Sequence, residues 1–156
     1  PAGTEEMPAS LAKPSVAEEL PASLSGASVI RSNAAASLVD LGDGVLAVSL
    51  HSKMNAIGGD TIEMLEAGVR AAADGHAGLV VSTDGPHFSA GANLMLVLLA
   101  AQEGEWDDID LMVRGFQRAT MAMRLSPVPV VVATGGLALG GGCELSLHAD
   151  RVHAAA

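Results

Sequence analysis

Three consecutive glycines, Gly140 to Gly142, separate an apolar run from a short segment that carries Glu144 in its first turn. The run, residues 128–133, predicts a buried strand, and residues 143–149 predict a short helix. Glycines let the backbone approach a ligand closely, and the first N–H groups of a helix point at such a ligand. This arrangement suits an oxygen that carries negative charge, with Glu144 as a candidate acid or base beside it. Glycines that only permit tight packing fit the pattern equally well, so both interpretations stay open at this point.

A second loop, residues 88–92, has the same design: it follows a predicted strand, consists mainly of small residues and leads into an apolar segment. If the two preceding strands are neighbours, each loop can aim one backbone N–H group at the same point. Two converging N–H donors form an oxyanion hole, in which each donor stabilises a transition state by about 3 kcal/mol. Phosphate binding is the competing interpretation. The sequence contains neither a GxxxxGKS or GxxxxGKT motif nor, over residues 135–142, a GxGxxG motif.

The other candidate side chains favour structural roles. The five histidines show no HExxH or other metal-ligand spacing, so no metal site is predicted. His148 and Asp150 lie near the expected end of a helix, where capping or pairing fits better than catalysis. Cys143 is interpreted as a small buried packing residue, because no sequence signature supports a thiol nucleophile.

Composition limits the classes of partner. A chain of 156 residues is long enough for one domain, and its core must be built from aliphatic side chains, because it has two Phe, one Trp and no Tyr. Eight basic and eighteen acidic side chains argue against nucleic acid or an anionic membrane surface as partner. A single cysteine is consistent with a reducing, cytosolic setting. We expect no membrane span or signal peptide, and we expect the chain to be cut at both ends.

The chain divides into two segments by pattern. Residues 1–35 contain four prolines and few apolar side chains, which predicts a linker or disordered tail. Residues 36–156 alternate predicted strands and helices, which indicates an α/β layered fold with at least some parallel strands. The expected strands are a hairpin of residues 37–41 and 45–50, then 78–83 and 128–133. A helix is expected over residues 60–75, begun by a capping box at Asp60. An apolar segment at 94–101 and a polar turn at 102–108 follow. A second helix is expected over 109–125, with Met112 and Met123 in the core.

Taken together, three stretches resemble the crotonase (enoyl-CoA hydratase/isomerase) superfamily. They are Lys-Met-Asn-Ala-Ile at 53–57, Phe-Ser-Ala-Gly-Ala-Asn-Leu at 88–94, and residues 139–144 followed by His-Ala-Asp at 148–150. More narrowly, residues 51–58, 100–106 and 147–152 look like the hydratase part of long fused proteins that carry an N-terminal 3-hydroxyacyl-CoA dehydrogenase. The resemblance covers residues 37–156 and implies the crotonase-type ββα spiral, truncated here, which usually assembles as trimers or pairs of trimers.

The resemblance also implies roles for individual residues. The carbonyl of an acyl-CoA thioester would lie between the N–H groups of Ala92 and Gly141, while Glu144 would hold and deprotonate the water that adds to the double bond. Coenzyme A is then the carrier of the substrate and no separate cofactor is expected, since NAD would belong to the dehydrogenase half. The residues implied to line the coenzyme A site are Lys53, Met54, Ala56, Ala90, Gly91, Ala92, Asn93, Gly140 and Gly141. For Lys53, a lone loop cation, plain solvation is the alternative.

Two departures from the family pattern bear on function. Asn93 stands where the family commonly has Asp, and the second catalytic glutamate is expected beyond Ala156, so residues 1–156 alone are expected to lack useful hydratase activity. The sequence therefore predicts part of a cytoplasmic enoyl-CoA hydratase of fatty-acid β-oxidation that is a homo-oligomer when intact. An enoyl-CoA isomerase of the same fold, or a non-catalytic module for acyl-CoA binding or assembly, remains the alternative.

Overall fold

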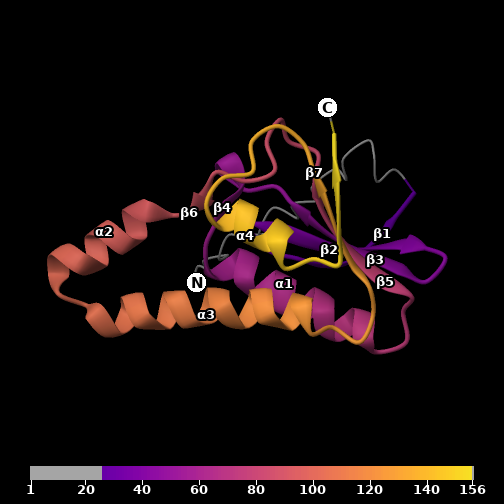
Figure 1. The fold of residues 1–156 in the computed structure, drawn as a ribbon, viewed down its shortest axis with the longest axis horizontal. Coiled ribbons are helices and arrows are strands. Elements are labelled where there is room, and N and C mark those ends of the chain that lie inside the picture. Colours follow the sequence, from indigo (N-terminus) through magenta and orange to yellow (C-terminus); the bar gives the residue numbers. More distant parts are fainter. Residues whose placement is uncertain (1–25, 156) are drawn as a thin grey trace, which may run out of the picture.

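The computed structural model describes residues 26–155 and consists of a six-stranded sheet with helices layered against it (Figure 1). The strands occur in the order β1-β2-β3-β5-β7-β8, in which β1 to β3 are antiparallel and β3, β5, β7 and β8 are parallel. They are β1 (Ser28–Ser32), β2 (Ala36–Gly42), β3 (Val45–Leu50), β5 (Gly78–Thr83), β7 (Val130–Thr134) and β8 (Arg151–Ala154). Two further strands, β4 (Ala56–Ile57) and β6 (Gly91–Ala92), form a small parallel sheet of their own.

The predicted hairpin is confirmed, and one strand precedes it. Residues 36–42 and 45–50 pair in antiparallel register, with Ala36 opposite Leu50. β1 pairs with β2 and all five of its residues are exposed at the sheet edge. Its residues fall in the segment predicted to be a linker, so that prediction is wrong for residues 28–32. The part of the predicted tail before residue 26 lies outside the described residues.

Helix α1 (Gly59–Ala73) connects the hairpin to the parallel part of the sheet and packs against β2, β3 and β5. Its buried residues, Thr61, Met64, Leu65, Gly68, Val69 and Ala72, repeat at helical spacing. The helix approaches the sheet closely at Gly68, where an added Cβ would lie 2.6 Å from Val48 Cγ2. The predicted capping box is wrong: Gly58 is the N-cap residue, and Asp60 already lies inside the first turn.

The core lies between α1 and the sheet and is aliphatic, as the composition requires. The single aromatic side chain fully buried in it is Phe88, which is 0% exposed and stands between the end of β5 and the small sheet. Met123 is buried, as predicted, whereas Met112 is only half-buried, so the core assignment of Met112 is wrong.

Helices α2 (Leu94–Glu103) and α3 (Trp106–Arg124) form a long hairpin that extends to one side of the sheet (Figure 1). Only Gly104 and Glu105 separate them, so the predicted turn over 102–108 is shorter than expected. The C-terminal half of α3 packs against α1, whereas α2 has no buried residue. We call α2 and residues 104–113 the arm. No helix within residues 26–155 has the length and apolar character to span a membrane.

Candidate active site

The loops at residues 88–92 and 137–142 are 45 or more residues apart in sequence but are joined by backbone hydrogen bonds. They lie side by side because the strands before them, β5 and β7, are parallel neighbours. Phe88 N–H donates to Gly135 O at 2.8 Å, and Ser89 N–H donates to Leu137 O at 3.1 Å. Leu139 N–H donates back to Ser89 O at 2.9 Å. Residues 88–92 and 137–142, which we call the loop junction, are thus neighbours, which meets the condition that the sequence analysis set for the two loops.

The backbone of the loop junction places Ala92 beside the first residue of helix α4 (Gly141–Leu147). Asn93 N–H donates to Ile57 O at 3.1 Å, on the β4 side of the small sheet. Because successive N–H groups of an extended strand point to opposite sides, the N–H of Ala92 points away from β4. A Cβ added to Gly141 would lie 3.7 Å from Ala92 N. The N–H of Gly141 has no partner within its own helix, as for any first helical residue.

Close packing explains why the loop junction is built from small residues. A Cβ added to Gly142 would lie 2.7 Å from Ser89 Cβ, and one added to Gly91 would lie 2.9 Å from Leu139 O. Gly91 and Gly140 also have positive φ angles of 92° and 46°, which a side chain disfavours. At Gly142, tight packing alone is a sufficient reason for glycine.

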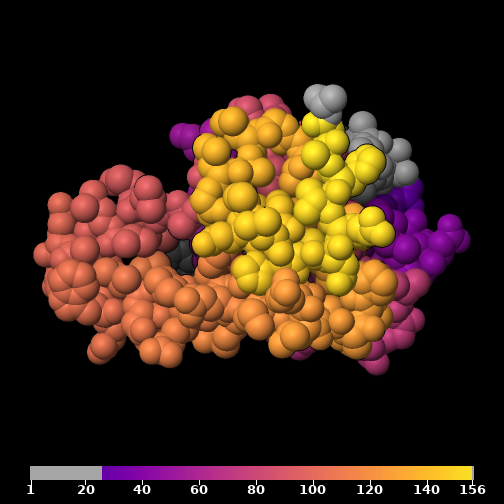
Figure 2. All heavy atoms as spheres, viewed as in Figure 1, coloured from indigo at the N-terminus to yellow at the C-terminus, as the bar shows by residue number. Residues whose placement is uncertain are grey.

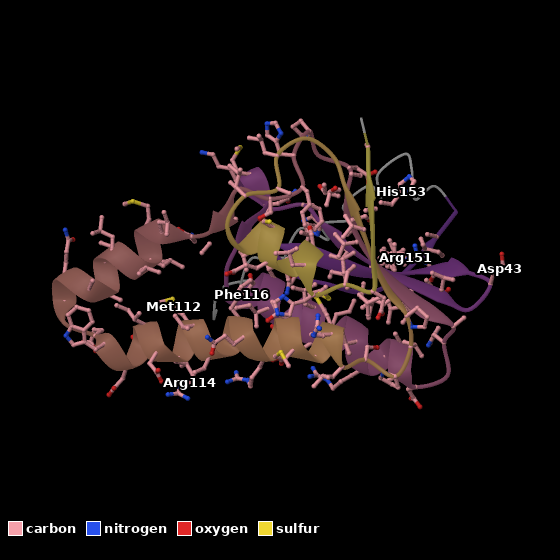
Figure 3. The ribbon with its side chains drawn as sticks, in the orientation of Figure 1. Asp43, Met112, Arg114, Phe116, Arg151 and His153 are labelled. Atoms are coloured by element: carbon pink, nitrogen blue, oxygen red, sulfur yellow. The ribbon has the colours of Figure 1, made fainter. Side chains whose placement is uncertain are left out.

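A groove of about 990 Å³ opens beside the loop junction. Ala92, Gly141, Glu144 and His148 line it together with side chains from α2 and α3, and the surface is hollowed between these elements (Figure 2). Met112 and Phe116 point from α3 toward the side on which α2 and α4 lie, whereas Arg114 points the other way (Figure 3). Among the described residues that line the groove, Glu144 is the sole carboxylate. The side of the groove formed by α2 and α3 is mainly apolar but includes Gln117, Arg118 and Thr120, and the other side includes Ala92, Gly141 and Glu144.

Helix α4 begins two residues earlier than predicted, and this changes what its side chains do. Cys143 is exposed rather than buried, so its interpretation as a buried packing residue is wrong. His148 Nδ1 donates to the carbonyl oxygen of Glu144 at 2.7 Å, because a carbonyl can only accept. Asp150 Oδ2 accepts from Val130 N–H at 2.8 Å. His148 and Asp150 thus each bond to the backbone, as residues that cap rather than catalyse do.

The loop implied to bind coenzyme A, which contains a 3₁₀ turn over Lys53–Asn55, lies against the same junction. Ala90 N–H donates to Met54 O at 3.0 Å, and Ala56 pairs with Gly91 in the small sheet. The structure therefore brings Met54 and Ala56 to the residues implied with them at 90–93. The side chain of Lys53 is exposed and lines neither the groove nor a smaller cavity of about 220 Å³ next to this loop.

A buried polar network that the sequence analysis did not identify joins the two loops. Ser89 Oγ donates to Asn55 O at 2.6 Å and accepts from Gly91 N–H at 3.0 Å. Asn55 Nδ2 donates to Thr83 Oγ1 at 2.8 Å and to His87 O at 3.0 Å. The partners of Asn55 are 28 to 34 residues away, so local spacing carries no signal for them.

Within residues 26–155 there is no group of three or more His, Cys, Asp or Glu side chains arranged to hold a metal ion. The polar or charged residues that line the groove are Asn93, Gln117, Arg118, Thr120, Glu144 and His148.

Comparisons with known proteins place this geometry in a family context. A family model described as "Enoyl-CoA hydratase/isomerase" matches residues 40–156. A relative from Bacillus subtilis named a probable 3-hydroxyacyl-CoA dehydrogenase is 42% identical over 127 residues, which is 81% of this chain and 16% of the relative. A probable enoyl-CoA hydratase from Mycobacterium bovis is 34% identical over 111 residues, covering 69% of this chain and 42% of the relative.

A solved structure gives the same result for the fold. The enoyl-CoA hydratase of Mycobacterium smegmatis matches with a TM-score of 0.67 at 27% identity, covering 80% of this chain and 48% of that one. The predicted crotonase-type fold and the resemblance on which it rested are confirmed, with this chain corresponding to part of the crotonase domain. The chain thus spans 16% to 48% of the lengths of the proteins named here.

Proposed function

This chain belongs to the enoyl-CoA hydratase/isomerase family, and we propose that it supplies the thioester-binding and proton-transfer part of an enoyl-CoA hydratase. One observation carries the proposal: Ala92, Gly141 and Glu144 line the same groove. This shared lining supports a site in which two backbone N–H groups and one carboxylate would meet a single ligand. The opposite face of the groove, formed by α2 and α3, offers apolar contacts to an acyl chain.

The reaction follows from where charge develops. Water adds its oxygen to the β-carbon of a 2-enoyl thioester, and the π electrons move toward the thioester oxygen. The N–H groups of Ala92 and Gly141 donate to that oxygen and stabilise its charge in the transition state. Glu144 holds the water and accepts its proton, the second glutamate of the intact hydratase would give a proton to the α-carbon, and 3-hydroxyacyl-CoA results; proton exchange with solvent then restores both carboxyl groups.

We propose that the coenzyme A part of the substrate lies along Lys53, Met54 and Ala56 and along residues 90–93, with Gly140 and Gly141 at its thioester end. The contacts of Met54 with Ala90 and of Ala56 with Gly91 support this placement, because they form one continuous edge that leads to Ala92. Lys53 would reach a phosphate of coenzyme A from its exposed position. The substrate needs no separate cofactor for this reaction.

The chemistry of the product suggests the wider context. Hydration gives a 3-hydroxyacyl-CoA, and the Bacillus subtilis relative is named for the dehydrogenase that oxidises such a compound. We propose that the chain works in fatty-acid β-oxidation in the cytoplasm, in a protein that also carries a dehydrogenase using NAD, and as a trimer-type homo-oligomer.

An enoyl-CoA isomerase is the second candidate, and one observation favours it. Glu144 is the sole carboxylate among the described residues that line the groove, and one carboxylate suffices to move a proton between two carbons. A non-catalytic module for acyl-CoA binding or assembly is the third candidate, since the groove could bind a thioester without transforming it.

Substitution of Glu144 separates the three candidates. In the whole natural protein, Glu144→Gln should lower the hydration of 2-butenoyl-CoA by about 10²- to 10⁴-fold, because it removes the base but keeps the shape. Hydration is followed by loss of the ultraviolet absorbance of the conjugated thioester, and binding by calorimetry with butanoyl-CoA. Glu103→Gln, an exposed change at the end of α2 outside the groove, is the matched control.

The outcomes differ in a way that identifies the function. Hydration that falls only in Glu144→Gln, with binding retained, supports the hydratase. Wild-type protein that converts 3-enoyl-CoA to 2-enoyl-CoA but does not hydrate would establish the isomerase. Wild-type binding without either reaction would leave the binding module.

A further inference from the structure

We propose that Ser89 and Asn55 are positioning residues that fix the N–H of Ala92 toward the thioester oxygen, an inference that rests on the proposed function. Neither side chain lines the groove, so both act through the backbone. Ser89 is 0% exposed and Asn55 is 5% exposed. Together they connect the loop implied to bind coenzyme A with the loop that carries Ala92.

The hydroxyl of Ser89 both donates and accepts a hydrogen bond. Its single proton goes to Asn55 O at 2.6 Å, and its oxygen accepts the N–H of Gly91 at 3.0 Å. The N–H of Asn93 is in turn bonded to Ile57 O at 3.1 Å. The peptide between Gly91 and Ala92, which carries the N–H of interest, therefore lies between two peptides whose N–H groups are both held.

This restraint matters because Gly91 has no side chain to limit the conformations of its backbone. Its φ of 92° is open to glycine, and the backbone around a glycine has more accessible conformations than around any other residue. Without the hydroxyl of Ser89, the N–H group of Gly91 loses the acceptor that Ser89 Oγ provides. The direction of the Ala92 N–H group would then vary in the unliganded protein, and the donor would be less well placed for the transition state.

Asn55 holds the acceptor to which Ser89 donates. Its backbone has a φ of 47°, in the left-handed region that asparagine tolerates better than most residues. Its Nδ2 donates to Thr83 Oγ1 and to His87 O, which anchors the residue to the end of β5. Strained backbone that is held in this way often marks a functional site. Here the anchored carbonyl of Asn55 sets the position of Ser89 Oγ.

A positioning role predicts an effect on rate rather than on binding. Loss of the Ser89 hydroxyl leaves Asn55 Nδ2 bonded to Thr83 Oγ1 and His87 O, so we expect the Lys53 loop to keep its anchor. In the whole natural protein, Ser89→Ala should therefore lower kcat for 2-butenoyl-CoA hydration by about 10- to 100-fold and change KM by no more than about threefold.

Ser49→Ala is the matched control, because Ser49 is also buried and its Oγ has no hydrogen-bond partner. It should leave both constants unchanged.

A spectroscopic measurement tests the same role without turnover. Butanoyl-CoA labelled with ¹³C at its carbonyl binds but cannot be hydrated, and donation from two N–H groups lowers its infrared carbonyl frequency. The shift on binding should be smaller in Ser89→Ala than in wild type, and unaltered in Ser49→Ala. If Ser89→Ala does not fold, the kinetic constants and the carbonyl shift are measured in Asn55→Gly instead. Glycine accepts the positive φ, so this variant loses only the hydrogen bonds of the Asn55 side-chain amide.

Each outcome decides the proposal. Wild-type kcat and a wild-type carbonyl shift in Ser89→Ala, or in Asn55→Gly where that variant replaces it, overturn the positioning role and leave the proposed function intact. A rise in KM with kcat unchanged also overturns it, because the residues would then serve binding. Wild-type protein with neither hydration nor a carbonyl shift overturns the proposed function and this role with it.

Discussion

The loop junction and the arm border the same groove, yet they are packed in opposite ways. In the junction, Phe88 and Ser89 are 0% exposed, and a Cβ added at Gly142 would meet Ser89 at 2.7 Å. In the arm, Leu94 is 74% exposed, and Trp106 is 67% exposed. The junction is thus crowded around Phe88, Ser89 and Gly142, although Leu137 and Leu139 at its rim are exposed, while the arm presents apolar side chains to the solvent along most of its length.

The difference fits what each region would do in catalysis. Stabilising a developing charge requires donors held at fixed positions before the substrate arrives, which a crowded, hydrogen-bonded backbone provides. Contact with an acyl chain requires only apolar surface, and side chains of Leu and Met adapt to its shape. We therefore expect substitutions of the same kind to be costly in the junction and mild in the arm.

The largest contrast should come from aromatic side chains. Phe88→Ala should lower the free energy of unfolding by about 3–5 kcal/mol, because it leaves a cavity in the core. Trp106→Ala, on the exposed arm, should change it by no more than about 0.5 kcal/mol. Urea unfolding of the two variants, followed side by side by circular dichroism, measures both values. A loss of several kcal/mol in Trp106→Ala would contradict the comparison, since it would show that the arm is packed in solution.

Two glycines with positive φ give a sharper contrast. Gly91 in the junction has a φ of 92° and Gly104 in the arm has a φ of 77°, so alanine is strained at both. An added Cβ meets Leu139 O at 2.9 Å at Gly91 but nothing within 4 Å at Gly104. Gly104→Ala should cost about 1 kcal/mol from backbone strain alone, and Gly91→Ala about 3 kcal/mol because crowding is added. Equal losses would mean that the junction can relax around a methyl group.

The comparison also shows which parts of the fold the sequence can predict. The hairpin and β5 have long apolar patterns, and the structure has them at or near the predicted residues. The exposed edge strands β1 and β8 were missed, because no buried face imposes an alternating pattern on them. Cys143 was expected to be buried as a small apolar residue, but Gly141, Gly142 and Leu145 form the buried side of α4 and Cys143 is exposed.

The candidate site was predicted in a similar, partial way. Motif residues on either side of the junction could be found, since each motif is contiguous and the parallel order of β5 and β7 brings the loops together. The roles of Asn55 and Ser89 could not be found, because their hydrogen bonds reach across 34 residues and depend on the positive φ of Asn55. Long-range polar pairing has no periodicity that a single sequence reveals.

The smallest expected effect concerns how α3 is attached to the body of the protein. Arg118 on α3 lies 3.8 Å from Glu66 on α1, but the arginine side chain is 63% exposed. An exposed ion pair of this kind contributes about 0–1 kcal/mol, and Glu66 keeps a second partner in Arg70 at 3.6 Å. Arg118→Ala should therefore lower the free energy of unfolding by less than about 0.5 kcal/mol, and by less still at high salt. If the loss in urea unfolding exceeds 1 kcal/mol, charge rather than the burial of Ala119 and Met123 holds α3 in place. The arm would then depend on ionic strength, and the contrast between a fixed junction and an open apolar arm would hold only at one salt concentration.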